Sequence, residues 1–195
     1  AFIAADITGA TLGIIGLGRI GQAMAKRAAG FDMRILYTDV RRASPAVELQ
    51  WGAAFVPLDV LLRESDFVTI HVPLFESTRH LIDARALALM KPTAYLVNAA
   101  RGPIVDEQAL VNALQKGTIA GAALDVYENE PRLAEGLAQL DNAILIPHLG
   151  ANSRRTRDRM AAMTADNIAV ALEGGTPPNL VNPEVLPHRR TLTGG

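Results

Sequence analysis

The chain contains no cysteine, which excludes a disulfide-stapled scaffold, thiolate zinc sites and cysteine nucleophiles. It also has no run of the ~18 apolar residues that a membrane span needs. The N-terminus, AFIAADITGAT, lacks a basic region followed by a long apolar stretch. We therefore expect a soluble, cytoplasmic protein with no membrane partner.

An excess of charge of one sign is missing too. The 19 Lys and Arg residues nearly balance the 20 Asp and Glu residues, for a net charge of −1. No overall field is available to hold DNA or RNA, so no nucleic-acid partner is expected. The sequence also lacks internal repeats and low-complexity segments. What it does have is 49% hydrophobic residues in 195, enough for one well-buried core and marginal for two.

Apolar runs of strand length alternate with segments of helical periodicity. The strands are predicted at 11–16, 33–38, 55–56, 66–72, 93–100, 119–126 and 142–148. The helices are predicted at 19–30, from Ser44-Pro45 onward, and at 57–65, 83–90, 106–117 and 152–173. Ile20, Met24 and Ala28 should form one apolar stripe, and Met160 and Met163 should be core residues. Such alternation predicts an α/β fold: a doubly wound parallel sheet (Rossmann fold) covered on both faces.

A glycine-rich turn follows the first predicted strand. Gly16-Leu17-Gly18-Arg19-Ile20-Gly21 matches G-x-G-x-x-G, a weak pattern by itself because methyltransferases carry related turns. Here it lies directly after an apolar strand and opens a helix. Gly16 would allow the tight turn, Gly18 the approach of a pyrophosphate, and Gly21 the close packing of helix on sheet. The free N–H groups of the helix would bind the anion, so we predict a dinucleotide cofactor.

The choice between NAD and NADP depends on the end of the second predicted strand. Asp39 lies eighteen residues after Gly21, where an acidic residue accepts hydrogen bonds from the adenosine ribose and repels a 2′-phosphate. Arg41 and Arg42 follow at once, and a guanidinium can hold that phosphate. Two solvated loop arginines are the simpler interpretation. NAD is therefore the predicted cofactor, and NADP stays possible.

Three unlike ionisable residues follow later strands. Arg101 follows the strand at 93–100, Glu130 follows the strand at 119–126, and His148 closes the strand at 142–148. In an open α/β sheet the ligand lies beyond the carboxyl ends of the strands, so these residues should converge on one rim. Each alone has a structural explanation as a salt bridge, a solvated loop acid or a surface histidine. His71, His80 and His188 lack metal-ligand spacing, so no metal site is predicted.

These motifs resemble the D-2-hydroxyacid dehydrogenase family, which includes glyoxylate, hydroxypyruvate, glycerate, lactate and phosphoglycerate dehydrogenases. The similar segments are TLGIIGLGRIGQAMAKRAAGFDM, DFVTIHVPLFESTRHLID, LMKPTAYLVNAARGPIVDEQALVNAL, GAALDVYENEP and IPHLGANS. The resemblance runs from about Thr11 to about Val181, and the subgroup most resembled is the glyoxylate/hydroxypyruvate reductases. Leu149 and Ala151 stand where the family usually has isoleucine and often serine, which are mild changes.

The resemblance implies a catalytic set and a set of cofactor contacts. The catalytic residues would be Arg101, Glu130 and His148. The cofactor contacts would be Gly16, Leu17, Gly18, Arg19, Ile20, Gly21, Asp39, Pro73, Thr78, Ala99, Asp125 and Gly150. The implied activity is NAD(P)-dependent hydride transfer between the nicotinamide and a small D-2-hydroxy acid or 2-keto acid.

The three catalytic assignments also make chemical sense. A planar guanidinium such as that of Arg101 can hold the carboxylate of a 2-keto acid and polarise its carbonyl oxygen. A histidine is the natural proton donor near neutral pH. Glu130, if it bonds the second ring nitrogen of His148, favours the imidazolium, which suits reduction.

The same resemblance implies a second, substrate-binding domain, which we expect to be absent from this chain. Residues 1–10 would be a remnant of the interdomain linker, residues 11–174 the dinucleotide-binding domain, and residues 175–195 a tail that returns to the missing domain. A homodimer formed through helices such as 106–116 and 152–173 is also implied. The alternative is a corepressor-like module of the same fold, which uses NAD(H) to control assembly. A methyltransferase would leave the three rim residues unexplained.

Overall fold

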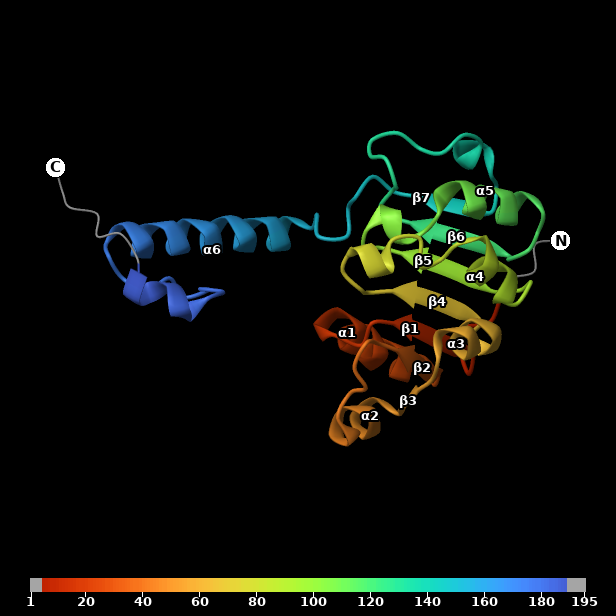
Figure 1. The fold of residues 1–195 in the computed structure, drawn as a ribbon, viewed down its shortest axis with the longest axis horizontal. Helices are drawn as coiled ribbons and strands as arrows, with labels where there is room; N and C mark the ends of the chain where they lie inside the picture. The colour runs from red at the N-terminus through yellow and green to blue at the C-terminus, as the bar shows by residue number, and fades with distance from the viewer. Residues whose placement is uncertain (1–4, 189–195) are drawn as a thin grey trace. The chain divides into compact units, whose positions relative to one another are not determined.

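Seven parallel strands between residues 11 and 145 form one sheet (Figure 1). A computed structural model describes residues 5–188. The strand order is β3-β2-β1-β4-β5-β6-β7, so the direction of winding reverses between β1 and β4. The strands are β1 Thr11–Ile15, β2 Arg34–Thr38, β3 Ala53–Phe55, β4 Phe67–Ile70, β5 Tyr95–Asn98, β6 Gly121–Leu124 and β7 Ala143–Leu145. The predicted α/β, doubly wound parallel sheet is confirmed.

Helices alternate with the strands. The α-helices are α1 Arg19–Ala28, α2 Pro45–Trp51, α3 Leu58–Glu64, α4 Ala84–Leu89, α5 Glu107–Gln115 and α6 Arg154–Leu172. Single 3-10 turns lie at Ala29–Phe31, Glu76–Thr78, Gly102–Ile104 and Leu137–Gln139, and a longer one at Pro183–His188. Side-chain caps begin several helices, and the predicted cap Ser44 accepts the N–H of Val47. No helix in the described part of the chain is long and apolar enough to cross a membrane.

The strands are shorter than their apolar runs. The run 142–148 gives only three strand residues, because the chain leaves the ladder before His148, whose φ is 53°. The third strand lies at 53–55 instead of the predicted 55–56. Ile146, which follows β7, is 41% exposed, so an apolar run alone overestimates the length of the strand.

Two apolar clusters cover the two faces of the sheet. On one face α3, α4 and α5 bury the larger cluster, which includes Leu61, Leu87 and Leu110. On the other, α1 and α2 cover the strands β1–β3. The predicted stripe on α1 is wrong at Ile20, which is 68% exposed. The helix packs through Gly21, Ala25 and Ala28 instead, because only small residues allow it to approach the sheet closely.

The second face of the sheet carries no helix over β4–β7 within residues 5–148. Phe67, Tyr95, Val97 and Ile144 line an open hollow there. The rings of Phe67 and Tyr95 stack with their centroids 5.5 Å apart, and Ile144 is 67% exposed. Helices were expected on both faces of the sheet. Within residues 5–148 they cover one face fully and the other face only over β1–β3.

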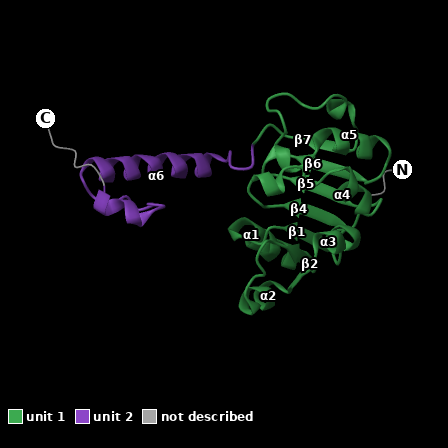
Figure 2. Cartoon of the chain, viewed as in Figure 1, with its two compact units in different colours: residues 1–148 green, residues 149–195 purple. Residues whose placement is uncertain are grey.

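The chain divides into two compact units, residues 1–148 and residues 149–195 (Figure 2). The division falls earlier than the end of the predicted domain at residue 174. In the second unit, helix α6 begins at a Ser153 cap and has no buried residue. Met160 and Met163 lie on this helix, and the expectation that they are core residues stays a prediction.

Candidate active site

The glycine turn joins β1 to α1, where the sequence predicted it. Gly16 has a φ of 94°, and a Cβ on it would lie 2.9 Å from the backbone of His71. A Cβ on Gly21 would overlap the carbonyl oxygen of Gly16, so both positions require glycine. A Cβ on Gly18, in contrast, would meet no protein atom within 4 Å. Since no side chain caps α1, its first N–H groups are available, and the turn fits a cofactor pyrophosphate.

Asp39 lies directly after β2 and faces this turn. Its Oδ2 accepts the N–H of Leu17 at 2.9 Å. The structure therefore brings together the two predicted parts of the adenosine site, the glycine turn and the acidic residue. The carboxylate is only part-buried, which leaves oxygen surface for the hydroxyls of a ribose.

Arg42 is exposed, as expected, but its guanidinium also has a carboxylate partner. Its Nε donates to Oε1 of Glu48 at 2.8 Å and its Nη2 donates to Oε2 at 2.9 Å. Arg41 is exposed, as expected. The two adjacent arginines therefore differ: one guanidinium is bound by a carboxylate in a two-pronged contact, and the other extends into solvent.

The remaining predicted cofactor residues come from separate loops. The hydroxyl of Thr78 donates to the carbonyl oxygen of Pro73 at 2.8 Å, so these two lie together in the loop after β4. Ala99 directly follows β5, and Asp125 directly follows β6 and is 5% exposed. Gly150 lies in the second unit and belongs to a separate part of the chain.

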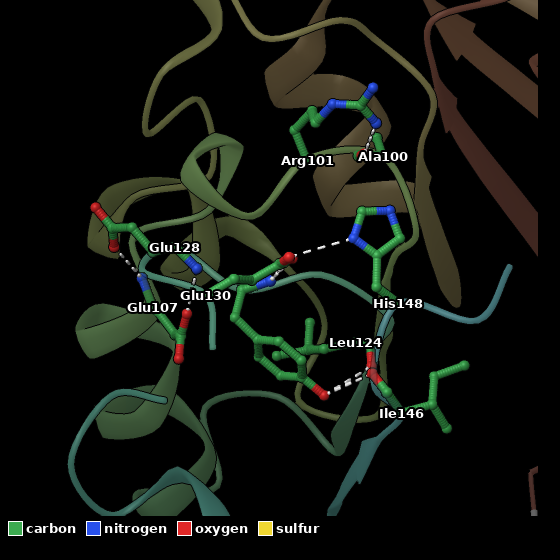
Figure 3. A network of polar contacts seen from close by, with 9 residues as sticks. Ala100, Arg101, Glu107, Leu124, Glu128, Glu130, Ile146 and His148 are labelled. Atoms are coloured by element: carbon green, nitrogen blue, oxygen red, sulfur yellow. Dashed lines mark hydrogen bonds and ion pairs between the residues drawn. The ribbon is translucent and has the colours of Figure 1, made fainter. Parts of the chain in front are cut away.

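The three predicted catalytic residues follow three neighbouring strands. Arg101 comes after β5, Glu130 after β6 and His148 after β7, and β5, β6 and β7 are adjacent and parallel. Their carboxyl ends therefore meet at one edge of the sheet. Figure 3 shows Arg101 in the same close-up as the paired side chains of Glu130 and His148.

Glu130 and His148 form a pair. Nδ1 of His148 lies 3.2 Å from Oε2 of Glu130, and the N–H of Tyr127 donates to Oε1 at 3.0 Å. The N–H of Tyr127 and the contact with His148 hold the pKa of Glu130 below its usual value, so this carboxylate stays charged near neutral pH. The side chain of His148 is 56% exposed and that of Glu130 is 40% exposed, and Glu130 contacts only Nδ1 of the ring.

Arg101 is held by its backbone, while its side chain is exposed. The buried Asn98 accepts the N–H of Ala100 at 3.1 Å and donates to the carbonyl oxygen of Arg101 at 3.0 Å. Nη1 of Arg101 donates to the carbonyl oxygen of Ala100 at 2.7 Å, so other N–H groups of the guanidinium stay available for an anion.

A family model for the "D-isomer specific 2-hydroxyacid dehydrogenase, NAD binding domain" matches residues 1–150. The chain belongs to this family. It is 53% identical over 189 residues to a glyoxylate reductase of Thermococcus onnurineus, covering 97% of the chain and 56% of that protein. A glyoxylate reductase of Pyrococcus horikoshii gives the same identity and the same coverage.

Solved structures agree with this membership in the 2-hydroxyacid dehydrogenase family. A glyoxylate reductase from Paecilomyes thermophila is 41% identical with a TM-score of 0.85, covering 94% of this chain and 55% of that one. The holo D-mandelate dehydrogenase of Rhodotorula graminis is 37% identical with a TM-score of 0.83, covering 92% and 54%. The chain thus spans about half the length of these relatives. The predicted family and NAD-binding fold are confirmed.

Two residues of this dehydrogenase domain escaped the sequence analysis because they contact no expected ligand. Gly102 lies against the backbone of Tyr127, and a Cβ on it would overlap the carbonyl group there. Glu107 is 4% exposed and accepts the N–H groups of Glu128 and Ala134, each at 2.7 Å. Both fasten the loop of Arg101 to the loop of Glu130.

The sequence carried a weak signal for Gly102 and none for Glu107. Gly102 directly follows Arg101, where a glycine indicates close backbone approach. Glu107 looked like an ordinary acidic residue in a first helical turn. His80, interpreted as a structural or surface residue, lies 2.6 Å from Oε1 of Glu128 and ties a third loop to the same network. No group of three metal-ligating side chains occurs within residues 5–188.

Proposed function

We propose that this chain is the cofactor-binding part of an NAD(P)-dependent reductase of small 2-keto acids, with glyoxylate or hydroxypyruvate favoured. The observation that carries the proposal is the pair of Glu130 and His148 on the sheet edge that also carries Arg101. The relatives named glyoxylate reductase support the choice of substrate. They also make the corepressor-like alternative the less favoured one.

Arg101 would bind the keto acid. Its guanidinium is exposed and planar, and can donate two N–H groups to a carboxylate or one to the neighbouring carbonyl oxygen. When bound, NADH supplies the hydride that reduces the carbonyl carbon. The positive charge of Arg101 then stabilises the negative charge that develops on the substrate oxygen.

His148 would supply the proton. Glu130 holds Nδ1, which fixes the orientation of the ring and leaves Nε2 to face the substrate oxygen. The imidazolium is the form that donates a proton. In the oxidative direction the neutral ring would accept the proton of the substrate hydroxyl.

The cofactor would lie across the glycine turn after β1, beyond the carboxyl ends of β1 and β4, where the winding reverses. The proposed contacts are Gly16, Leu17, Gly18, Arg19, Ile20 and Gly21 at the pyrophosphate, Asp39 at the ribose, and Pro73, Thr78, Ala99, Asp125 and Gly150 elsewhere. The open space at Gly18 and the free N–H groups of α1 support this placement.

Oxidation of NADH in the presence of glyoxylate or hydroxypyruvate, measured with the whole protein, tests the proposal. Turnover that depends on the keto acid is expected. Tight NADH binding without turnover would instead support the corepressor-like module. A homodimer and a cytoplasmic location are further proposals, which sedimentation of the chain and cell fractionation would test. The domain limits 11–174 and 175–195 also stay predictions.

A further inference from the structure

Helix α2 places a carboxylate beside the loop that follows β2. Glu48 lies in the first turn of α2, and the side chain of Arg42 reaches it from that loop. Asp39, the expected ribose contact, is three residues before Arg42 on the same loop. One of the two guanidiniums that follow Asp39 is therefore already bound by an acid.

Several hydrogen bonds hold the ion pair of Arg42 and Glu48 in place. Both oxygens of Glu48 accept from Arg42, at 2.8 and 2.9 Å, in the two-pronged geometry that a guanidinium and a carboxylate favour. Glu48 is also held by a core residue, because the hydroxyl of the fully buried Tyr37 donates to Oε1 at 2.6 Å. The N–H of Ala43 donates to that hydroxyl at 2.9 Å. The acid is thus held in place by the core.

The side chain of Arg42 is much more exposed than that of Glu48. The Glu48 side chain is 14% exposed, whereas that of Arg42 is 66% exposed. Only the arginine can therefore move away. Arg42 and Tyr37 together hold the pKa of Glu48 at about 2, so the carboxylate is charged at every pH at which the protein would work.

We propose that Glu48 is a specificity-determining residue that disfavours NADPH by withholding Arg42 from the 2′-phosphate. The inference rests on the proposed cofactor site at Asp39. A 2′-phosphate would have to share the Arg42 guanidinium with Glu48 or displace it from Glu48, and it would be repelled by the negative charge of Glu48 in either case. NADH meets neither obstacle.

The test is the ratio of NADPH to NADH dissociation constants, measured by calorimetry on this chain. Glu48→Gln keeps an acceptor for Tyr37 but removes the charge that binds Arg42. We expect NADPH to bind about fivefold to tenfold more tightly in this variant, with NADH affinity unchanged. The double variant Glu48→Gln/Arg42→Ala should lose the gain, and Glu48→Gln/Arg41→Ala should keep it.

The outcomes separate the inference from the proposed function. An unchanged ratio in Glu48→Gln, with NADH still bound, overturns the role of Glu48 and leaves the cofactor site intact. A gain that survives removal of Arg42 also overturns it. Equal weakening of both cofactors would mean that Glu48 has only a structural role. Failure of NADH to bind the parent chain would instead count against the proposed cofactor site itself. Should Glu48→Gln unfold, Arg42→Ala in the parent gives the reverse check, since the parent ratio should then stay unchanged.

Discussion

Gly102 and Tyr127 are in direct backbone contact, so close that a single added methyl group on Gly102 would overlap the carbonyl of Tyr127. This contact joins the loop of Arg101 to the loop that carries Glu130. Because Tyr127 also donates its N–H to Glu130, the position of the carboxylate follows from the position of that backbone. The geometry of the proposed catalytic pair thus depends on a residue without a side chain.

Gly102→Ala should destabilise the protein by about 3 kcal/mol, since neither backbone can yield without moving a loop of the proposed site. Chemical unfolding measures the effect. Gly30→Ala is the matched control: a Cβ there meets nothing within 4 Å, so its free energy of unfolding should stay close to that of the parent. Equal stability of the two variants would contradict the close contact.

Glu107→Gln should cost about 1–3 kcal/mol of stability, because an amide NH₂ would face one of the two backbone N–H donors that the carboxylate now accepts. Glu135→Gln, at an exposed position, is the control and should be close to neutral. Denaturant midpoints of the three proteins give the comparison. A neutral Glu107→Gln would show that the buried acid is dispensable to the loop.

His148→Ala in the whole protein should lower kcat by about two to four orders of magnitude while NADH affinity stays the same, since a general acid acts on the reaction and not on cofactor binding. Steady-state kinetics and fluorescence titration separate the two quantities. His188→Ala, at an exposed histidine, should leave both unchanged. Comparable activity of the two variants would remove His148 from the proposed mechanism.

Gly18→Ala should keep the stability of the parent but weaken NADH binding, because the space beside Gly18 is open in the protein and is needed by the pyrophosphate. Gly21→Ala should lose both, since its Cβ would overlap the carbonyl oxygen of Gly16. Thermal melting with and without NADH distinguishes the variants. Undiminished NADH affinity in Gly18→Ala would place the pyrophosphate elsewhere.

The pairing of Glu48 should make stability depend on pH in the acid range. Arg42 and Tyr37 lower the pKa of Glu48 from 4.5 to about 2 in the folded protein. The pair therefore contributes its full stability above about pH 4.5, and the contribution is lost as the pH falls toward 2. The difference in Tm between the parent and Glu48→Gln should be constant near neutral pH and shrink below about pH 4.5. A difference that does not change with pH would contradict the assignment.

The sequence by itself determined the strand–helix alternation, the place of the glycine turn and the strands that the three proposed catalytic residues follow. Each of these is local information. The period of apolar residues identifies the elements, and glycines mark the turn whose φ only they adopt readily. The carboxyl ends of parallel strands lie at one edge of a sheet. Arg101, Glu130 and His148 each follow such a strand, so they could be placed at that edge without any knowledge of contacts.

Only the tertiary structure decided which side chains bind one another. Arg42 and Arg41 are identical in type and adjacent in sequence, yet one is bound by Glu48 and the other extends into solvent, because α2 packs where it can meet just one of them. Glu107 looked like an ordinary acid of a first helical turn, yet it is buried and accepts the N–H of Glu128, 21 residues away. Hydrogen bonds between distant segments depend on how the chain packs, and no local pattern records that packing.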